Sequence, residues 1–507
     1  MTDTPFNDSD LRACLRVLQA IEADRGVLTR LTQEERRELL TLAGLIAKPD
    51  GNDMRRMAKA FRRAEREIKQ QQDQQALERA GLRQQRRSET YAPLWLPPPE
   101  MESADEQRLS LSAARACYVC KQPYTDVHRY YDSMCRSCGD FNYAKREQTA
   151  DLHGRYALVT GARVKIGYQA SLKLLRAGAH VVVTTRFPVD AAERYAQEPD
   201  YPAFRDRLQI HGIDLRHTPS VELFARWLGE QLPRLDFILN NACQTVRRPA
   251  GFFRHLLARE AEGAAALPAA LRGPLAQHEA LRHALLETPD RSNNTVVAHA
   301  KRSYAEGLVH SAGLSQRHYL DEDYLAGESF FPAGHFDEDR QQVDLREMNS
   351  WRLRLHEVQT PELLEVQLVN AIAPYILNAR LKLLMMKSGA RDLHIVNVSA
   401  MEGQFYRTTK TDKHPHTNMA KAALNMMTRT SAPDYVRDGI HMNAVDTGWV
   451  TDEDPAVHAA RKAEQGFAPP LDIIDGAARI VDPIFSGMHS RTHLWGQFLK
   501  DYKSAPW

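Results

Sequence analysis

The chain has 507 residues, of which 43% are hydrophobic and 26% are charged, and its formal net charge is +2. This length exceeds one ordinary core, so about two or three domains are expected. A charge this close to neutral favours neither nucleic acid nor a membrane surface as the partner of the whole molecule. The first ten residues do not resemble a signal peptide, no apolar run has the length of a membrane span, and four of the six cysteines cluster. These features predict a cytoplasmic protein without a membrane partner.

Residues 1–100 are predicted to form a helical arm that ends in a linker. Apolar residues at helical spacing indicate a first helix near residues 11–21, with Ser9 or Asp10 available as its cap. Thr32 and Glu35 form a capping-box pattern that opens a second helix. A third helix after Pro49 carries a thin apolar stripe, and the prolines at 93 and 97–99 mark the linker.

The third helix is rich in arginine and lysine, which allows two interpretations. One is an arm that grips nucleic acid. The other is a solvated helix that packs against a protein partner. Glutamate and glutamine dilute the charge, and no aromatic residues are interleaved to stack on bases. We therefore expect a protein partner for this arm, and no nucleic acid.

Two CxxC pairs lie within residues 101–150. Each pair presents two thiolates on one tight turn, and two such turns complete a tetrahedral zinc site. Because sulfur fills all four positions, none stays open to water, which favours a structural ion over a catalytic one. A redox-active dithiol pair is the alternative. The predicted ligands of this small zinc module are Cys117, Cys120, Cys135 and Cys138.

A strand, a glycine turn and a helix follow one another between residues 155 and 175. Residues 156–159 are an apolar run typical of a buried strand, and helical periodicity resumes after the turn. Such a turn exposes backbone N–H groups, and the helix start is the positive end of its dipole, so the arrangement suits a pyrophosphate. The predicted cofactor-binding residues of the turn are Thr160, Gly161, Arg163, Lys165, Ile166 and Gly167.

From residue 151 onward, strands and helices alternate as a doubly wound parallel sheet requires, so the predicted fold class is α/β with a Rossmann sheet. Further strands are predicted at residues 180–186, 209–215, 235–243, 392–399 and 439–445. The second strand ends on Arg186, where a carboxylate would bind the adenosine ribose. An arginine accommodates a 2′-phosphate instead, which favours NADP(H) over NAD(H). Asp214, in the third strand, is placed to meet the adenine.

The order of these motifs resembles the short-chain dehydrogenase/reductase family over residues 151–507. The resemblance is carried by the glycine turn, Asp214-Leu215, Asn240-Asn241-Ala242, Asn370, Ser399, Lys421, and Asn443-Ala444-Val445 with Gly448. It implies a nicotinamide cofactor and hydride transfer to or from a carbonyl or an alcohol. It also implies that Asn370, Ser399, Thr417 and Lys421 occupy catalytic positions. Further cofactor contacts are implied at Leu215, Asn241, Ala242, Lys421, Gly448, Val450 and Thr451.

Four positions depart from the family's pattern: Cys243 and Thr447 are mild changes, and the other two, Lys165 and Thr417, bear on the site. Lys165 stands where a glycine is usual; pteridine reductases also have a basic residue there and use NADPH, which supports a phosphate contact. Thr417 stands at the position of the catalytic tyrosine, four residues before Lys421. A threonine hydroxyl is far too weak an acid to protonate a carbonyl directly. Tyr406, His414 and His416 are the candidate substitutes, each with the alternative of being an ordinary surface side chain.

Residues 244–358 form an insertion that the family does not need. An ordinary loop of that length is uncommon, and we expect helices near residues 252–260, 267–271 and 278–286. A lid over the cofactor and a surface for an oligomer or a partner are both open. The residues expected to face the site are Arg247, Arg248, Trp351 and Arg352. The C-terminus resembles the family's last strand, near the place of an oligomer interface in relatives.

Two functions therefore remain in view, together with a weaker third. The first is an NADP(H)-dependent oxidoreductase with an unidentified small-molecule substrate and a non-standard proton donor. The second is a catalytically silent family member that binds NADP(H) and signals through its helical arm and zinc module. The third is a nucleic-acid-associated protein.

Overall fold

The computed structural model describes residues 7–87, 110–287, 303–325, 327–337, 339–406, 410–451 and 453–507. The chain divides into two compact units, Met1–Asp73 and Gln74–Trp507. The proline linker predicted at residues 93–99 lies outside the described residues. Among the described residues, no helix combines the length and the apolar character that crossing a bilayer requires.

The first unit is helical, as predicted. It holds α1 (Asp8–Ala23), the 3₁₀ turn η1 (Arg25–Arg30), α2 (Gln33–Ala47) and the greater part of α3 (Gly51–Glu78). Thr32 and Glu35 form the predicted capping box of α2. The cap predicted for α1 was wrong: Asn7, not Ser9 or Asp10, accepts the backbone N–H groups of Ser9 and Asp10 at 2.8 and 3.2 Å. The helix begins two or three residues earlier than expected, so Ser9 and Asp10 lie inside its first turn.

The second unit begins with the end of α3, α4 (Gly81–Arg87) and the four-cysteine module. The module consists of the antiparallel strands β1 (Ser110–Ala116) and β2 (Pro123–Asp126), followed by α5 (Arg136–Glu147). Arg146 of α5 is fully buried and makes two hydrogen bonds of 2.6 Å with Asp472, the N-cap of α18 (Ile473–Ser490). This bidentate pair attaches the module to the large domain.

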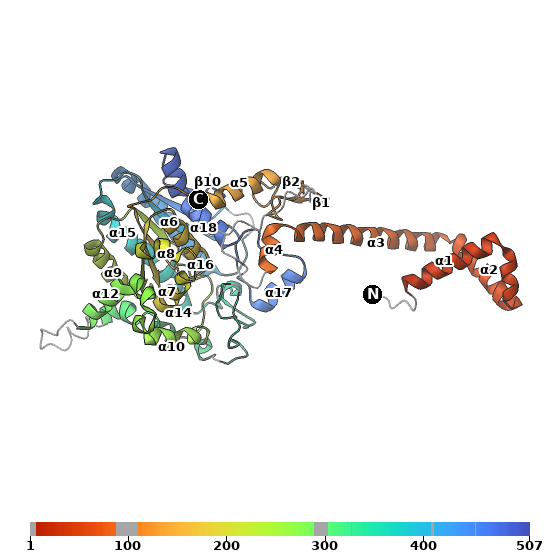
Figure 1. Cartoon of the computed structure of the whole chain (residues 1–507), viewed down its shortest axis with the longest axis horizontal. Coiled ribbons are helices and arrows are strands. Elements are labelled where there is room, and N and C mark those ends of the chain that lie inside the picture. The colour runs from red at the N-terminus through yellow and green to blue at the C-terminus, as the bar shows by residue number, and fades with distance from the viewer. Residues whose placement is uncertain are drawn as a thin grey trace. The chain divides into compact units, whose positions relative to one another are not determined.

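The large domain is built on a sheet with the order β10-β9-β8-β7-β6-β3-β4-β5. Figure 1 shows the helices that surround this sheet. Its strands are parallel except β10, which is antiparallel to β9. The strands are β3 (Tyr156–Thr160), β4 (His180–Thr185), β5 (Leu208–Gly212), β6 (Phe237–Asn240), β7 (Leu393–Ser399), β8 (Ile440–Asp446), β9 (Phe498–Lys500) and β10 (Lys503–Ala505). The predicted doubly wound α/β fold is confirmed. The order reverses between β3 and β6, which is the point where such sheets bind ligands.

Each central strand is buried on both faces, because helices cover both sides of the sheet. Successive side chains point to opposite sides and so enter two different cores. Val159 and Val183 pack with α6 (Lys165–Arg176) and α18 on one face. Leu158 and Val182 belong to the opposite core, with α9 (Thr218–Gln231) and α15 (Ala373–Met386). The remaining helices of this domain are α7 (Pro188–Ala196), α8 (Tyr201–Phe204), α14 (Thr360–Gln367), α16 (Pro415–Tyr435) and α17 (Ala456–Glu464).

The insertion carries the three helices that its sequence predicts. They are α10 (Arg254–Glu262), α11 (Ala269–Arg272) and α12 (Ala276–Glu287), and residues 303–309 form a further helical segment. Phe252 and Phe253 pack against Phe187 and Phe331 in a small aromatic core of their own. The insertion is therefore a packed structure and not an extended loop.

Candidate active site

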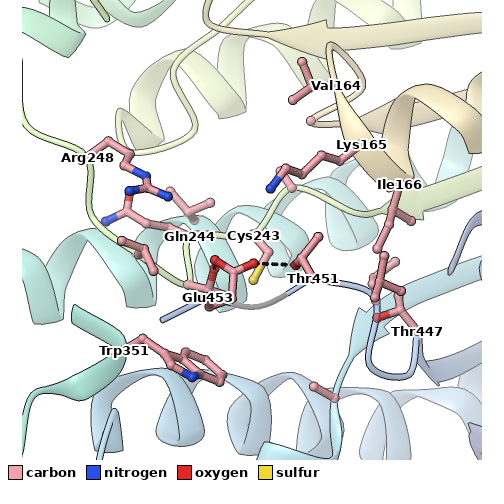
Figure 2. Close-up of a pocket in the computed structure, with 18 of the residues that line it drawn as sticks. Val164, Lys165, Ile166, Cys243, Gln244, Arg248, Trp351, Thr447, Thr451 and Glu453 are labelled. Carbon is pink, nitrogen blue, oxygen red and sulfur yellow. Dashed lines mark hydrogen bonds between the residues drawn. The ribbon is translucent and has the colours of Figure 1, made fainter. Parts of the chain in front are cut away.

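A cavity of about 1350 Å³ opens at the carboxyl ends of the parallel strands, where the sheet order reverses. It is lined by the glycine turn, the ends of β4, β7 and β8, residues of the insertion, and Tyr118 from the four-cysteine module. Figure 2 shows Lys165 extending from the glycine turn into this space, with Arg248, Trp351 and Glu453 on the walls around it. The volume exceeds the range of drug-sized pockets, about 300–1,000 Å³, and suits a dinucleotide together with a second molecule.

The glycine turn is held against the end of β6 by backbone proximity. A Cβ at Gly161, whose φ is +66°, would lie 2.8 Å from Cα of Ala242. A Cβ at Gly167 would lie 2.3 Å from Nδ2 of Asn241. That amide donates to the backbone oxygens of Thr160 and Gly161 at 3.1 Å. Both glycines are therefore required by space, and Asn241 and Ala242 fix the turn from behind, as the dinucleotide motif demands.

Lys165 occupies the left-handed region of the backbone, with a φ of +56°. This explains why a glycine is usual here, because a side chain in this conformation costs of order 1–3 kcal/mol. Burial alone would lower the pKa of Lys165, but the nearby carboxylates of Glu453, Asp339 and Asp337 raise it above its ordinary value. The residue is a strained, charged ammonium directed into the cavity.

Arg186 follows β4 and lines the cavity as predicted, while its guanidinium packs over the ring of Phe253 at 4.5 Å. Burial, and then the neighbouring charge of Arg216, lower the pKa of Arg186 to about 10. Within the described part of the chain, no carboxylate forms an ion pair with it. By contrast, Arg163 is paired with Asp190 at 2.6 Å. Arg186 is thus a half-buried cation at the cavity wall, and a bound anion such as the 2′-phosphate of NADP(H) would complement its charge.

Asp214 and Leu215 line the cavity on the same side. The carboxylate of Asp214 is 1% exposed and lies 2.6 Å from the guanidinium of Arg216, which also contacts Glu365 at 2.8 Å. Burial would raise the pKa of Asp214, but Arg216 and Arg186 lower it, so the group is ionised. The structure thus places Asp214, for which the sequence predicts an adenine contact, on the cavity wall, with Arg216 holding its side chain.

Ser399 ends β7 and Lys421 lies on α16, and both line the cavity. The Ser399 hydroxyl donates to Oδ1 of Asn425 at 2.6 Å, and the Lys421 ammonium donates to the carbonyl of Val398 at 2.8 Å. Asn370 lies in the π-helical turn η9 (Leu368–Ile372), where its amide bonds the N–H and the carbonyl of Gln244 at 2.7 and 3.1 Å. It therefore fixes the start of the insertion and does not line the cavity.

Thr417 does not line the cavity either. Its residue is 2% exposed, and its hydroxyl is buried without a hydrogen-bond partner among the described residues. Tyr406 also lies away from the cavity lining, with 87% of its surface exposed. His416 is buried instead, with Nε2 3.6 Å from Glu362. None of these three side chains meets the cavity in this structure.

His414 is the one of the suggested substitutes that lines the cavity. Its ring stacks on Trp351 of the insertion, with 3.9 Å between centroids and 6° between planes. Its Nδ1 lies 3.2 Å from Oδ1 of Asn418, and its backbone N–H donates to Leu353 at 2.8 Å. The residue has a φ of +42° at the start of α16, a strained conformation of the kind that clusters at active sites. Burial lowers the pKa of His414.

The insertion residues expected to face the site divide into two pairs. Arg248 and Trp351 line the cavity. Arg247 and Arg352 do not, which corrects that expectation: Arg247 is bound by Asp323 at 2.7 and 2.8 Å, and Arg352 lies 3.3 Å from Asp454.

The segment after β8 closes another side. Gly448, Val450 and Thr451 line the cavity, and the Thr451 hydroxyl donates to Glu453 at 2.8 Å, the dashed contact in Figure 2. Glu453 was missed from the sequence. Burial would raise the pKa of its carboxyl, but Lys165 lowers it, so this wall carries a negative charge. Only the approach of Lys165 from a distant turn reveals that role.

The four cysteines come together as their spacing predicts. Their sulfur atoms all lie within 4.8 Å of one another, and those of Cys120 and Cys135 are 3.8 Å apart. A tetrahedral zinc with Zn–S bonds of about 2.3 Å requires sulfur atoms about 3.8 Å apart. Burial raises the pKa of the Cys117 thiol, but backbone N–H donors outweigh it and lower the value to about 7. The donor set therefore fits a closed, structural metal site.

Comparison with known proteins places the large domain. Residues 155–262 match the family model described as short chain dehydrogenase, and residues 348–468 match the model described as enoyl-(acyl carrier protein) reductase. The chain is 31% identical over 403 residues to Uncharacterized protein R665 of Acanthamoeba polyphaga mimivirus, covering 77% of this chain and 75% of the relative. The chain belongs to the short-chain dehydrogenase/reductase family.

Other members of the short-chain dehydrogenase/reductase family match over shorter spans. Retinol dehydrogenase 11 of Homo sapiens is 27% identical over 190 residues, which is 37% of this chain and 52% of that protein. WW domain-containing oxidoreductase of Drosophila melanogaster is 37% identical over 95 residues, which is 18% of this chain and 23% of that protein. The chain thus spans about half or less of the length of these two relatives. A solved Pseudomonas aeruginosa RhlG/NADP complex aligns with 16% identity and a TM-score of 0.41, over 69% of this chain and 95% of that one.

Proposed function

We propose that this protein is an NADP(H)-dependent oxidoreductase in which His414 replaces the missing tyrosine as the proton-transferring group. The observation that carries the proposal is the shared cavity of Ser399, Lys421 and His414, from which Thr417 is absent. NADP(H), when bound, would supply or accept the hydride. The residues present fit this cofactor: Gly161 and Gly167 leave no room for a side chain in the turn, Lys165 extends a cation from it, and Arg186 adds a second cation without an ion-pair partner among the described residues.

The roles of the three side chains follow from their chemistry. The Ser399 hydroxyl would orient a substrate oxygen, and the Lys421 ammonium would bind the nicotinamide ribose, as the family's pattern implies. Since Nδ1 of His414 contacts Asn418, Nε2 is the atom that faces a substrate. In reduction, the His414 imidazolium donates its Nε2 proton to the carbonyl oxygen and becomes neutral. In oxidation, neutral imidazole accepts the alcohol proton. Burial lowers the pKa of His414, so the neutral, proton-accepting form prevails near pH 7.

The insertion supports this chemistry as a lid that also positions the donor. Trp351 provides the surface on which the His414 ring stacks, and Leu353 accepts the His414 backbone N–H. Arg248 adds a cation to the cavity wall and contacts Asp344. A substrate that enters here would therefore meet residues of the insertion on one side and Ser399 on the other. Its chemical class is a small carbonyl or alcohol compound.

The test compares the native chain with His414→Asn, which keeps a hydrogen-bonding group near Asn418 but cannot transfer a proton. His416→Asn, at a buried position outside the cavity, is the matched control. NADPH oxidation with a panel of aldehydes and ketones should fall about 10²- to 10⁴-fold in His414→Asn, with NADPH affinity unchanged. If His414→Asn turned over as fast as the native protein and the His416→Asn control, His414 would have no part in the mechanism.

A second function, a silent NADP(H)-binding protein, is favoured by one observation. Among the described residues, the Thr417 hydroxyl is buried without a hydrogen-bond partner, so no proton-transferring group occupies the position of the usual acid. This function predicts tight NADPH binding with no turnover on any compound of the panel, and equal binding by native protein and His414→Asn. The same titration and assay therefore distinguish the two.

A further inference from the structure

Three histidines meet near the amino-terminal ends of two strands, whereas the cavity lies at the carboxyl ends. His394 is the second residue of β7 and His441 is the second residue of β8, and they are direct partners in the parallel register. His493 follows the end of α18. The cavity is lined by the last residues of the same two strands, Ser399 and Asp446. Five residues of strand separate the two places, a distance of about 16 Å.

The three imidazoles are close enough to share one ion. One ring nitrogen from each lies within 4.8 Å of the others. Nε2 of His394 and Nδ1 of His493 are 2.9 Å apart, and ring centroids are separated by 4.8–5.3 Å. Nδ1 of His441 lies 3.2 Å from the carbonyl of Leu393. A hydrogen bond from that nitrogen fixes the tautomer and leaves Nε2 as a ligand, which is the usual arrangement of metal-binding histidine.

Hydrogen bonding within the described part of the protein accounts for only part of the cluster: His394 and His493 share one hydrogen bond, and His441 bonds the carbonyl of Leu393. His394 is fully buried, and its Nδ1 has no partner among the described residues. Three imidazole nitrogens that converge in this way can share one metal ion.

A glycine of α18 makes room for this cluster. A Cβ at Gly487 would lie 2.5 Å from Nδ1 of His493 and 3.3 Å from Cε1 of His394. The guanidinium of Arg155, which lies near the cluster, is bound by Asp392 at 2.6 Å and by Asp236 at 3.0 Å, and these carboxylates offset its positive charge.

We propose that His394, His441 and His493 form a second metal site, which binds one divalent transition-metal ion through three imidazole nitrogens. Imidazole suits Zn²⁺, Ni²⁺ and Cu²⁺, and three histidines plus water complete the tetrahedron that zinc prefers. The site differs from the four-cysteine module in its ligands and position. An ion there would cross-link β7, β8 and the segment that leads from α18 to β9, and so would stabilise the C-terminal part of the sheet.

The experiment measures the zinc content of the full chain by plasma mass spectrometry, after loading with Zn²⁺ and gel filtration. The variants are His441→Ala and His493→Ala, both at partly exposed positions, with the exposed His356→Ala of the insertion as the matched control. We expect both cluster variants to hold one zinc fewer per chain than the native protein and the control. The measured quantity is the difference in zinc per chain between variant and native protein, so zinc bound at the cysteine site cancels.

A second variant and a second probe guard against misfolding. Gly487→Ala keeps all three ligands but displaces the His493 ring, and should weaken binding of Ni²⁺ in calorimetric titrations about tenfold or more. Cys117→Ser should leave that Ni²⁺ titration unchanged. Equal zinc content in the native protein and both histidine variants would overturn the proposal. A Ni²⁺ affinity unaffected by Gly487→Ala and by His493→Ala would overturn it as well.

Discussion

The hydroxyl oxygen of Tyr118 lies 2.9 Å from the backbone nitrogen of Trp449 and accepts its hydrogen bond. Tyr118 stands between the first two cysteines of the four-cysteine module, and Trp449 follows Gly448 in the segment that closes the cavity. A Cβ at Gly448 would lie 3.1 Å from the same hydroxyl. The module therefore forms part of the cavity wall, and its metal and the cofactor are expected to be coupled.

Tyr118→Phe should weaken NADPH binding about fivefold. The variant removes the acceptor of the Trp449 N–H, and one hydrogen bond contributes about 1 kcal/mol. Fluorescence titration with NADPH measures the change. Tyr143→Phe, in α5 and outside the cavity lining, is the control and should bind as the native protein does. Unchanged affinity in Tyr118→Phe would mean that the contact does not reach the cofactor.

Removal of zinc from the cysteine site should lower both stability and cofactor affinity. Because four converging thiolates form a metal site only in the folded module, metal binding supplies part of its folding free energy. Cys138→Ser should lower Tm by several degrees and should hold one zinc per chain fewer than the native protein. NADPH affinity should fall at least as far as in Tyr118→Phe. Loss of zinc with full retention of Tm and affinity would show that the module is independent of the domain.

Arg186→Asp should exchange the cofactor preference. The variant removes the Arg186 cation and places at this position a carboxylate of the kind that binds ribose hydroxyls. Affinity for NADPH should therefore fall about 10- to 100-fold, while NADH binding improves. The same change of charge at the exposed Arg205 is the control. A variant that still prefers NADPH would assign the 2′-phosphate to Arg163 or Lys165 instead.

The reductive reaction should be fastest in acid. Burial lowers the pKa of His414, so the proton-donating imidazolium is populated only below the ordinary histidine value of about 6.5. kcat/KM for carbonyl reduction should therefore rise as pH falls toward that lowered pKa, whereas alcohol oxidation should lose activity over the same range. In His414→Asn, this pH dependence of kcat/KM should be absent from both carbonyl reduction and alcohol oxidation. A pH dependence that persists in the variant would belong to another group.

Lys165→Gly should separate stability from binding. Glycine accepts the positive φ without strain, so the free energy of unfolding should stay equal or increase by about 1 kcal/mol. NADPH affinity should nevertheless fall about tenfold, because a phosphate contact is lost. Denaturant unfolding and NADPH titration on the same preparation measure both. Lys165→Ala, which also removes the charge but keeps the strained backbone, should lose affinity without any gain in stability.

Local patterns in the sequence were sufficient for the sheet and for the chemistry of single motifs. Residues 156–159 could be recognised as a strand and Gly161 as a turn because alternation, burial and the need for positive φ are properties of a few neighbouring residues. The cysteine pairs were equally local. The departures at Lys165 and Thr417 were visible for the same reason, since each depends only on spacing from its neighbours.

Tertiary structure decided which side chains share a space. Nothing in the local pattern distinguishes Arg248, which lines the cavity, from Arg247, which is bound by Asp323, or His414 from the buried His416. Tyr118 reaches Trp449 across 331 residues of chain, and His394 meets His493 across 99. Such contacts depend on how α5, α18 and the insertion pack on the sheet. This packing depends on the shapes of whole helix and sheet surfaces, which cannot be deduced from the spacing of residues along the sequence.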